Sequence, residues 1–581
     1  MKTFSKKLLG KIPAGAVHFF IIAALILFFG FLFFSNRAFG SWGDDSPGYI
    51  YLTHKIFFHK PLVYQDALVE RGLDFFHKPA RADFLAPRHH TIISPDGFVA
   101  SKYPVGLSFL MVIPVLFTGN LDDIYFVLPF FAVATLVLVY GIAYILVRRW
   151  RYSFLIAFLS ALALGLSTLY ENYGISQPMR EIPSIFFLLL ALWFLLLLKE
   201  YTPKKPVFYV LLALSAISLG FSFNIRETGI ILMPAFFMVG LSVARSYGWT
   251  WKGFILPALV FCLFLVGTLS LTVWNSAQIS AHSVSFDSGT AAPVLLSNID
   301  HLESFSWRNI YDNQGKFRPG EGGIVHYWGV IQGMSPFPFW FVLVVFGMVV
   351  YMYRGSKLLG GALIVWVLSV VLLFSLWINP YSRYILPIFP VLAVFGSIGL
   401  VSVLVVVVDY VQRRWLRDII VLACFGVLFI FVQPYALEEF RDQFSGGVLQ
   451  FKAISHSDLQ TLKGIADVIE PGDMEQRLET DDTLLMFSGT WQYGLSETFE
   501  NHTGIRAIRS PLEQRSAISA DTATDFFTAD VFPHYQVYAW LDDTSPVVYR
   551  DWLTQNFQLD LVTVRAFTFQ ENVSIYKLTP K

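Results

Sequence analysis

The sequence predicts a polytopic α-helical membrane protein with about 11 transmembrane helices and a small C-terminal α/β domain outside the membrane. Three observations predict this fold class. Of the 581 residues, 55% are hydrophobic and only 14% are charged, and the mean hydropathy is +0.56. Many apolar runs are long enough to cross a bilayer core of about 30 Å. Basic residues gather between alternate runs, and the last part of the chain has the composition of a soluble domain.

Each of eleven apolar runs is predicted to cross the membrane once. They comprise residues 14–34, 124–147, 153–169, 182–198, 207–222, 229–244, 253–274, 337–353, 358–377, 384–408 and 418–434. The first run follows basic residues but is too long for a typical signal peptide, so we expect a retained anchor. A twelfth run, residues 105–118, is short and contains Pro114. This favours an interfacial or re-entrant helix rather than a span.

The basic residues of the loops decide the orientation of the predicted helices. If residues 105–118 do not cross, one side of the membrane holds a series of basic clusters. They are Lys2, Lys6, Lys7, Lys11, Arg148, Arg149, Arg151, Lys199, Lys204, Lys205, Arg245, Lys252, Arg354, Lys357, Arg413, Arg414 and Arg417. Because clustered Lys and Arg favour the cytoplasmic side, we expect the N-terminus inside and the C-terminus outside.

The chain is predicted to divide into two domains near residue 434. Residues 1–434 would form the transmembrane domain, with a first external loop at 35–104 and a long external loop at 275–336. Residues 435–581 differ in composition, because the amphipathic stretch "LQTLKGIADVIE" is followed by short β-rich runs. These runs are "TLLMFS", "QVYAWL", "LDLVTVRAF" and "SIYKL". They predict a small α/β domain on the outer face.

Isolated cations mark the external face. Arg180, Arg226 and Arg383 each stand alone in a short external turn, and Lys102 begins the short amphipathic segment. A single Arg at a span end often only reaches toward lipid headgroups. Three of them on the same face as paired acids predict instead a site that collects an anion.

The paired acids are Asp44 and Asp45, in "GDDSPGY" just after the first span. The stretch "DDSPG" is also a strong turn sequence, so a solvated turn is the alternative interpretation. A carboxylate at the membrane edge that faces cations is the arrangement needed to deprotonate a hydroxyl while a phosphate departs. Glu171, in the turn after the third span, is a further candidate for contacting an acceptor or a metal ion. Neither a P-loop nor a G-x-S-x-G elbow occurs, which disfavours an ATP-driven pump and a serine hydrolase.

Four motifs together resemble a known superfamily. They are "GDDSPGYIYLT", with the pattern Gly-Asp-(Asp/Glu)-x-x-x-Tyr; "DGFVASKYPVGLSFLMVIPVLFTG", with Lys/Tyr-Pro-x-Gly; "LGFSFNIRETGIILMP"; and "SRYILPIFP". In this order, residues 1–434 resemble GT-C glycosyltransferases that use a polyprenyl-phosphate sugar. The similar branch contains protein O-mannosyltransferases and the bacterial lipid A aminoarabinose transferase.

The resemblance implies an inverting sugar transfer on the extracytoplasmic face of the plasma membrane. Asp44 would be the general base on the acceptor hydroxyl, and Asp45 would assist or position it. Lys102, Arg226 and Arg383 would neutralise the departing lipid phosphate, with Arg180 as a further candidate, and Tyr49 would contact the donor. The implied partners are a polyprenyl-phosphate-linked sugar, the lipid bilayer, and a glycan, lipid or protein acceptor. The net charge of zero argues against nucleic acid as a partner.

The sequence departs from the family pattern in two places. Ser101 precedes Lys102 where the aminoarabinose transferase has an acid, so a divalent cation (Mg²⁺ or Mn²⁺) stays open and no other cofactor is implied. "TWQYG" matches the Trp-Trp-Asp-Tyr-Gly motif of oligosaccharyltransferases only in part. A non-enzymatic transporter, or an accessory subunit of a polysaccharide or glycolipid export complex, is the alternative function. A transporter would carry acids inside its spans, whereas these spans are almost free of them.

Overall fold

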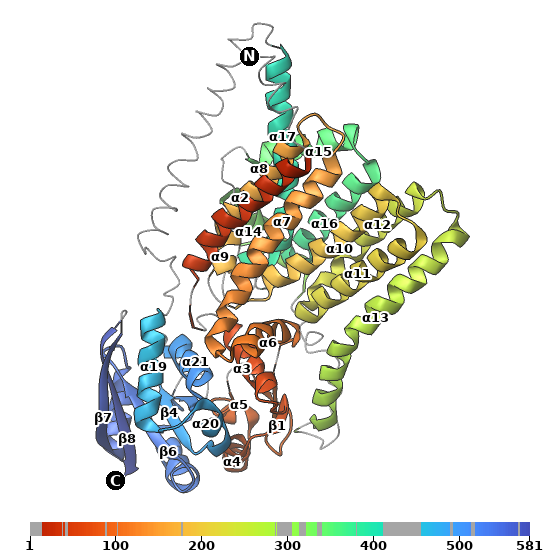
Figure 1. The fold of residues 1–581 in the computed structure, drawn as a ribbon. Helices are drawn as coiled ribbons and strands as arrows, with labels where there is room; N and C mark the ends of the chain where they lie inside the picture. The colour runs from red at the N-terminus through yellow and green to blue at the C-terminus, as the bar shows by residue number, and fades with distance from the viewer. Residues whose placement is uncertain are drawn as a thin grey trace.

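A computed structural model describes most of the chain. The described residues are 14–37, 39–40, 45–87, 90–101, 103–175, 178–284, 286, 305–312, 321–333, 340–378, 380–410, 455–488, 492–512, 518–567 and 570–581. A bundle of long apolar helices forms one part, and a mixed sheet with flanking helices lies at one end of it (Figure 1). The polytopic fold class with a C-terminal sheet domain is therefore confirmed.

Within the described ranges, eight helices are long and apolar enough to cross a membrane. The bundle contains α2 (Ala14–Ser35), η1 (Leu121–Phe126), α7 (Val127–Val147), α8 (Ser153–Gly165), α9 (Thr168–Ile175), α10 (Glu181–Tyr201), α11 (Lys205–Ile225), η2 (Glu227–Leu232), α12 (Met233–Ser246), α13 (Trp251–His282), η4 (Trp307–Ile310), α14 (Gly323–Gly333), α15 (Trp340–Arg354), α16 (Lys357–Ser375), η5 (Ser382–Ile388) and α17 (Phe389–Tyr410). The chain is thus a multi-pass membrane protein.

Ten of the eleven expected spans coincide with described helices. The expected span at 153–169 is bent by 65° between α8 and α9, and the two helices count as a ninth span only if taken together. The helix at 337–353 is represented by the 15 residues of α15. The expected span at 418–434 lies outside the described residues.

The short run at 105–118 forms α6 (Gly106–Thr118), which lies across the end of the bundle (Figure 1). Pro114 stands inside this helix. At its start, a Cβ added to Gly106 would lie 2.5 Å from the carbonyl oxygen of Asn224 in α11. Only glycine allows the two helices to approach this closely. The close contact fixes α6 at the bundle end, where a short interfacial helix was expected.

The first loop has a fold of its own that the sequence reading left undescribed. Its elements are α3 (Ser46–Phe57), β1 (Val63–Gln65), α4 (Ala67–Phe76), α5 (Pro79–Ala82), β2 (His90–Ile92) and β3 (Phe98–Ser101). The strands make an antiparallel sheet of order β1-β3-β2, with Val63 opposite Ala100 and His90 opposite Ser101. This sheet ends one residue before Lys102, so it positions the start of α6.

The C-terminal part contains a five-stranded sheet of order β5-β4-β6-β8-β7. Its elements are α19 (His456–Ile469), α20 (Met474–Thr480), β4 (Thr483–Phe487), α21 (Gln492–Thr503), β5 (Arg506–Arg509), α22 (Ala520–Phe526), a π-helical turn (Phe527–Val531), β6 (Gln536–Leu541), α23 (Val547–Asn556), β7 (Phe557–Phe567) and β8 (Gln570–Pro580). Strand β4 pairs parallel with β5 and β6, whereas β8 pairs antiparallel with β6 and β7. The four β-rich runs quoted above form β4, β6, β7 and β8.

The first loop and the C-terminal sheet share a hydrophobic core. Leu68, Phe76 and Leu85 of the loop pack in one cluster with Phe526 and Trp552 of the sheet domain. The rings of Phe76 and Phe526 lie 4.9 Å apart. The two segments therefore form a single packed unit at the bundle end, although almost 400 residues separate them in the sequence.

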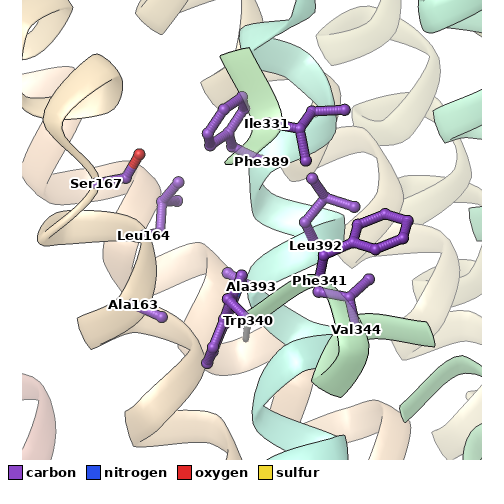
Figure 2. Close-up of a pocket in the computed structure, with 10 residues that line it drawn as sticks. All are labelled: Ala163, Leu164, Ser167, Ile331, Trp340, Phe341, Val344, Phe389, Leu392 and Ala393. Carbon is purple, nitrogen blue, oxygen red and sulfur yellow. The ribbon is translucent and has the colours of Figure 1, made fainter. Parts of the chain in front are cut away.

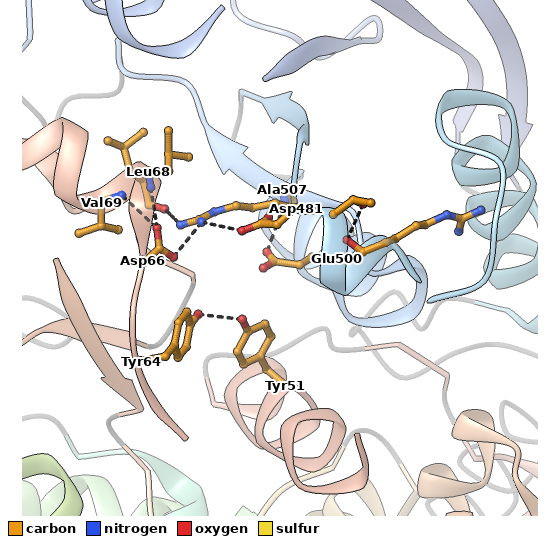
Figure 3. A network of polar contacts seen from close by, with 12 residues as sticks. Tyr51, Tyr64, Asp66, Leu68, Val69, Asp481, Glu500 and Ala507 are labelled. Carbon is orange, nitrogen blue, oxygen red and sulfur yellow. Dashed lines mark hydrogen bonds and ion pairs between the residues drawn. The ribbon is translucent and has the colours of Figure 1, made fainter. Parts of the chain in front are cut away.

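A polar network reinforces this shared core. The Arg506 guanidinium lies 2.8 Å from the Asp66 carboxylate, and both side chains are buried. Asp66 also accepts hydrogen bonds from the backbone N–H groups of Leu68 and Val69, which caps α4. Asp481 lies 3.8 Å from the same guanidinium, so the cation stands between two carboxylates, one from each segment (Figure 3). Asp66 thus orders its own helix and binds the C-terminal domain at once.

Candidate active site

The candidate site lies at the end of the bundle where α3, α6, α10, η2 and η5 meet. Three of its side chains come from places where an apolar helix starts or stops. Arg180 is the N-cap residue of α10, Arg226 joins α11 to η2, and Arg383 is the second residue of η5. Backbone N–H and C=O groups at helix ends lack partners within the helix, so polar side chains and ligands commonly gather there. The fold brings these three turns together.

Asp45 is the acid that the structure places against these cations. It is the N-cap residue of α3, and its side chain is buried. One carboxylate oxygen lies 3.0 Å from Nη2 of Arg383. The other accepts a hydrogen bond of 2.8 Å from the hydroxyl of Tyr103, the residue after Lys102. The predicted meeting of the first-loop acid with a late-span arginine is therefore present in the structure.

Glu181 is a second carboxylate at the centre of the cluster. Its Oε1 lies 3.6 Å from Nη1 of Arg226 and 3.8 Å from Nε of Arg383. Glu181 directly follows Arg180 in the chain, yet it lies between two arginines from distant turns, because the first turn of α10 points its side chain into the bundle end. All three side chains are buried.

The arginines retain hydrogen-bonding capacity. Among the described residues, Nε of Arg180, Nη1 of Arg226 and Nε of Arg383 are buried without a hydrogen-bond partner. The contacts with Glu181 are longer than a hydrogen bond, so they supply charge but do not satisfy these donors. A buried donor without an acceptor costs about 1–3 kcal/mol. An anion with several oxygens would relieve this cost at all three positions.

Aromatic rings surround the cations. The Arg226 guanidinium lies 5.3 Å from the ring centre of Tyr384, and that of Arg383 lies 5.5 Å from the same ring. Tyr49 packs against Tyr103 with 5.0 Å between ring centres. Burial raises the pKa of Tyr49 and of Tyr103 well above the ordinary value, so both hydroxyls stay protonated. Tyr103 therefore acts as a hydrogen-bond donor to Asp45.

The remaining predicted residues are placed as follows. Asp44 and Lys102 lie outside the described residues, although each adjoins a described member of the site, Asp45 or Tyr103. Glu171 is buried in α9, which packs against η5. In the part of the chain that the structure describes, no group of three or more His, Cys, Asp or Glu side chains could hold a metal ion.

An apolar pocket lies beside the charged cluster. Figure 2 shows Leu164 and Ser167 on one side of it, and Trp340, Phe389 and Leu392 on the other. Phe389 directly follows η5, which carries Arg383. Ser167 is at the bend between α8 and α9. The pocket is therefore a small apolar gap where α8, α15 and α17 meet.

Known structures share this architecture. The crystal structure of ArnT from Cupriavidus metallidurans in the apo state matches 97% of this chain and 98% of its own, with 14% identity and a TM-score of 0.57. The same enzyme bound to undecaprenyl phosphate matches with a TM-score of 0.55. The Archaeoglobus fulgidus oligosaccharyltransferase in the apo form matches 90% of this chain and 69% of its own, with 12% identity and a TM-score of 0.54.

The chain has the GT-C fold. This confirms the fold that the four motifs implied. No protein-family model matches the sequence, and no curated protein matches it either. The identities to the solved structures are 12–14%. At this distance the likeness establishes the fold alone.

Besides Glu181, the candidates from the sequence lacked two aromatic residues of the site. Tyr103 was quoted only as part of the "KYPVG" motif, yet it donates the hydrogen bond that orients Asp45. Tyr384 follows Arg383 directly and flanks two guanidinium groups. A signal was present, since each tyrosine adjoins a predicted cation at a helix end. An aromatic residue there has several ordinary explanations, which made the signal weak.

Proposed function

We propose that this protein is an inverting glycosyltransferase that transfers a sugar from a polyprenyl-phosphate donor to a hydroxyl group on the extracytoplasmic side of the plasma membrane. The observation that carries the proposal is the buried cluster in which Asp45 and Glu181 hold Arg226 and Arg383. Burying charges at a bundle end lowers stability, so charges kept there point to a function. The GT-C fold agrees with this chemistry.

The arginines would stabilise the leaving phosphate. When the bond between the sugar's anomeric carbon and the phosphate oxygen breaks, the electron pair goes to the phosphate. Negative charge then grows on its oxygens. Arg226 and Arg383 have donors available for these oxygens, with Arg180 beside them. Because the cations are fixed before the reaction begins, little reorganisation is needed as the charge develops.

Asp44 would act as the general base, and Asp45 as a positioning residue. The two carboxylate oxygens of Asp45 are already engaged by Arg383 and Tyr103, so Asp45 is poorly suited to take a proton. Its neighbour Asp44 would take the proton from the acceptor hydroxyl as the oxygen attacks the anomeric carbon. Attack opposite the leaving phosphate inverts the configuration.

The first part of the lipid tail would lie along apolar side chains of the bundle. Such a surface is formed by Leu164, Trp340, Phe389 and Leu392, where α8, α15 and α17 meet. Two related folds have been solved with such lipids, ArnT with undecaprenyl phosphate and the archaeal AglB with dolichol-phosphate. The tail could then stay in an apolar environment while the phosphate meets the arginines.

The side of the membrane follows from charge. The site lies at the end of α10 that begins with Arg180, and the basic clusters lie at the other end. By the positive-inside rule, the site would face outward. The acceptor would be a glycan, a lipid or a protein, each of which offers a hydroxyl at that surface.

Turnover with defined donors tests the proposal. The purified protein is incubated with a panel of polyprenyl-phosphate sugars, and released polyprenyl phosphate is measured. We expect release with at least one donor, and a loss of about 10³-fold in Asp44→Asn. Asp312→Asn is the matched control, because Asp312 is an exposed acid paired with Arg308.

Two results would contradict the proposal. If the Asp44→Asn variant binds donor and keeps full activity, Asp44 is not the general base. Movement of the intact lipid-linked sugar across vesicles, with no release from any donor, would instead favour a transporter.

A further inference from the structure

A second cationic cavity lies at the opposite end of the bundle. It has a volume of about 310 Å³. Its charged lining consists of Arg148, Arg149, Lys199, Glu200 and Arg354. Helix α10 connects the two regions, because Glu181 is in its first turn and Lys199 in its last. Eighteen residues of helix span about 27 Å, close to the thickness of a bilayer core.

The cations of this cavity outnumber its acid. Glu200 is the only carboxylate among the residues that line it, against four cationic side chains. Oε1 of Glu200 pairs with Nε of Arg148 and lies 3.5 Å from Nη2 of Arg149, and its Oε2 lies 3.9 Å from Nζ of Lys199. One carboxylate cannot neutralise this set, so the cavity keeps a net positive charge.

The backbone adds to this positive potential. The turn from α15 into α16 contributes Gly355 and Ser356 to the lining, and α16 begins at Lys357. The first N–H groups of a helix carry partial positive charge and point toward an anion in front of them. Ser356 caps one of these groups, because its hydroxyl accepts from the N–H of Leu359. The others add to the charge of the side chains.

The remaining walls are apolar and aromatic. Leu146, Leu196 and Leu359 line the cavity below the charges, and Trp150 packs on the buried Tyr351 at 6.2 Å between ring centres. Trp and Tyr are enriched where a membrane meets water. A charged mouth over apolar walls suits a molecule that has a phosphate at one end and hydrocarbon at the other.

We infer that this cavity binds a phosphate group, supplied either by the headgroup of an anionic membrane lipid or by free phosphate. The positive-inside rule alone would explain cations on this side of the membrane. It does not explain why four of them line one cavity around a single acid, with a helix N-terminus in the same wall. The inference depends on the membrane topology and is independent of the proposed transfer reaction.

The binding of short-chain lipids to the full-length protein tests this inference. Dioctanoyl phosphatidylglycerol is titrated in detergent and bound lipid is counted by native mass spectrometry, with dioctanoyl phosphatidylcholine as the neutral comparison. The cavity variant is Arg149→Gln/Arg354→Gln, in which both side chains are exposed enough for folding to survive. The matched control is Arg245→Gln/Lys252→Gln, which removes two exposed charges from the same side outside the cavity.

We expect the affinity of the cavity variant for phosphatidylglycerol to be at least about tenfold lower than that of the wild type. The affinity of the control variant should equal that of the wild type. A second arm adds inorganic phosphate. Displacement of the lipid would identify free phosphate as a competent ligand, and retention would assign the site to lipid headgroups. Equal affinity of phosphatidylglycerol for all three proteins would overturn the inference. Equal weakening in both double variants would overturn it as well.

Discussion

The two ends of the helix bundle carry similar charged groups in different surroundings. At one end, Glu181 lies between Arg226 and Arg383, whose side chains are 3% and 8% exposed. At the other end, Glu200 lies among cations that water reaches, and the side chain of Arg149 is 81% exposed. Water can supply the missing hydrogen bonds at the second end, but not at the first. The comparison therefore separates the buried charges, which we propose bind the donor phosphate, from charges that water screens.

The difference in burial also affects how strongly each end can bind an anion. Removing the last water from a guanidinium costs several kcal/mol, which an arriving anion can return. The buried cluster is therefore suited to hold a phosphate strongly while its charge increases. The open cavity at the other end is suited to a weaker and reversible contact with phosphate.

The largest expected effect on stability comes from removing the central acid of the buried cluster. Glu181→Gln leaves Arg226 and Arg383 facing each other with less compensation, and should lower the free energy of unfolding by about 3 kcal/mol. The same change at the other end, Glu200→Gln, should cost about 1 kcal/mol or less, because water screens the cations around it. Thermal unfolding of both variants in one detergent measures the difference. Equal losses of stability in the two variants would contradict the proposed difference between the two ends.

A pH-dependent effect of comparable size is expected at the boundary between the first loop and the C-terminal domain. Burial raises the pKa of Glu500 to about 7, from an ordinary value of 4.5. The folded state then holds a proton that the unfolded state releases, so stability should fall as the pH rises from about 4.5 to about 7. Glu500→Gln should remove this part of the pH dependence. The melting temperature of the variant should then fall by a few degrees less than that of the wild type across this pH window. An unchanged slope in the variant would assign it to other groups.

The smallest effect is expected at an exposed ion pair that begins in η4. Arg308 and Asp312 lie 2.8 Å apart, and their side chains are 60% and 39% exposed. Arg308→Gln should change the free energy of unfolding by less than about 0.5 kcal/mol. Chemical denaturation in detergent would detect a larger change. If Arg308→Gln lowers the free energy of unfolding as much as Glu181→Gln does, burial does not determine how much an ion pair contributes to stability in this protein.

Much of the fold could be predicted from the sequence, because hydrophobic length and loop charge act over short stretches of chain. The positions of α6, α10, β4 and β6 follow from such local patterns. Strand β5 was missed, since its sequence "RAIR" is short and half charged. The shared core of the first loop and the C-terminal sheet was also missed. It depends on packing between segments almost 400 residues apart, which no local pattern records.

The sequence indicated several of the charged residues of the site but not how they pair. Single charges at helix ends pointed to Arg226, Arg383 and Asp45. The partner of each charge could not be read from the sequence, because pairing depends on which turns the fold brings together. Glu181 illustrates this, since it follows Arg180 in the chain but lies between two other arginines in space.

Release of polyprenyl phosphate in the variant Arg383→Gln tests the central claim most directly. Arg383 contacts Asp45 at 3.0 Å and has a donor free for the leaving phosphate, so its loss should slow release by about 100-fold or more. Arg383→Lys should restore part of the rate, and Arg308→Gln should leave it unchanged. If Arg383→Gln releases polyprenyl phosphate as fast as the wild type, the buried cluster is not the site of transfer.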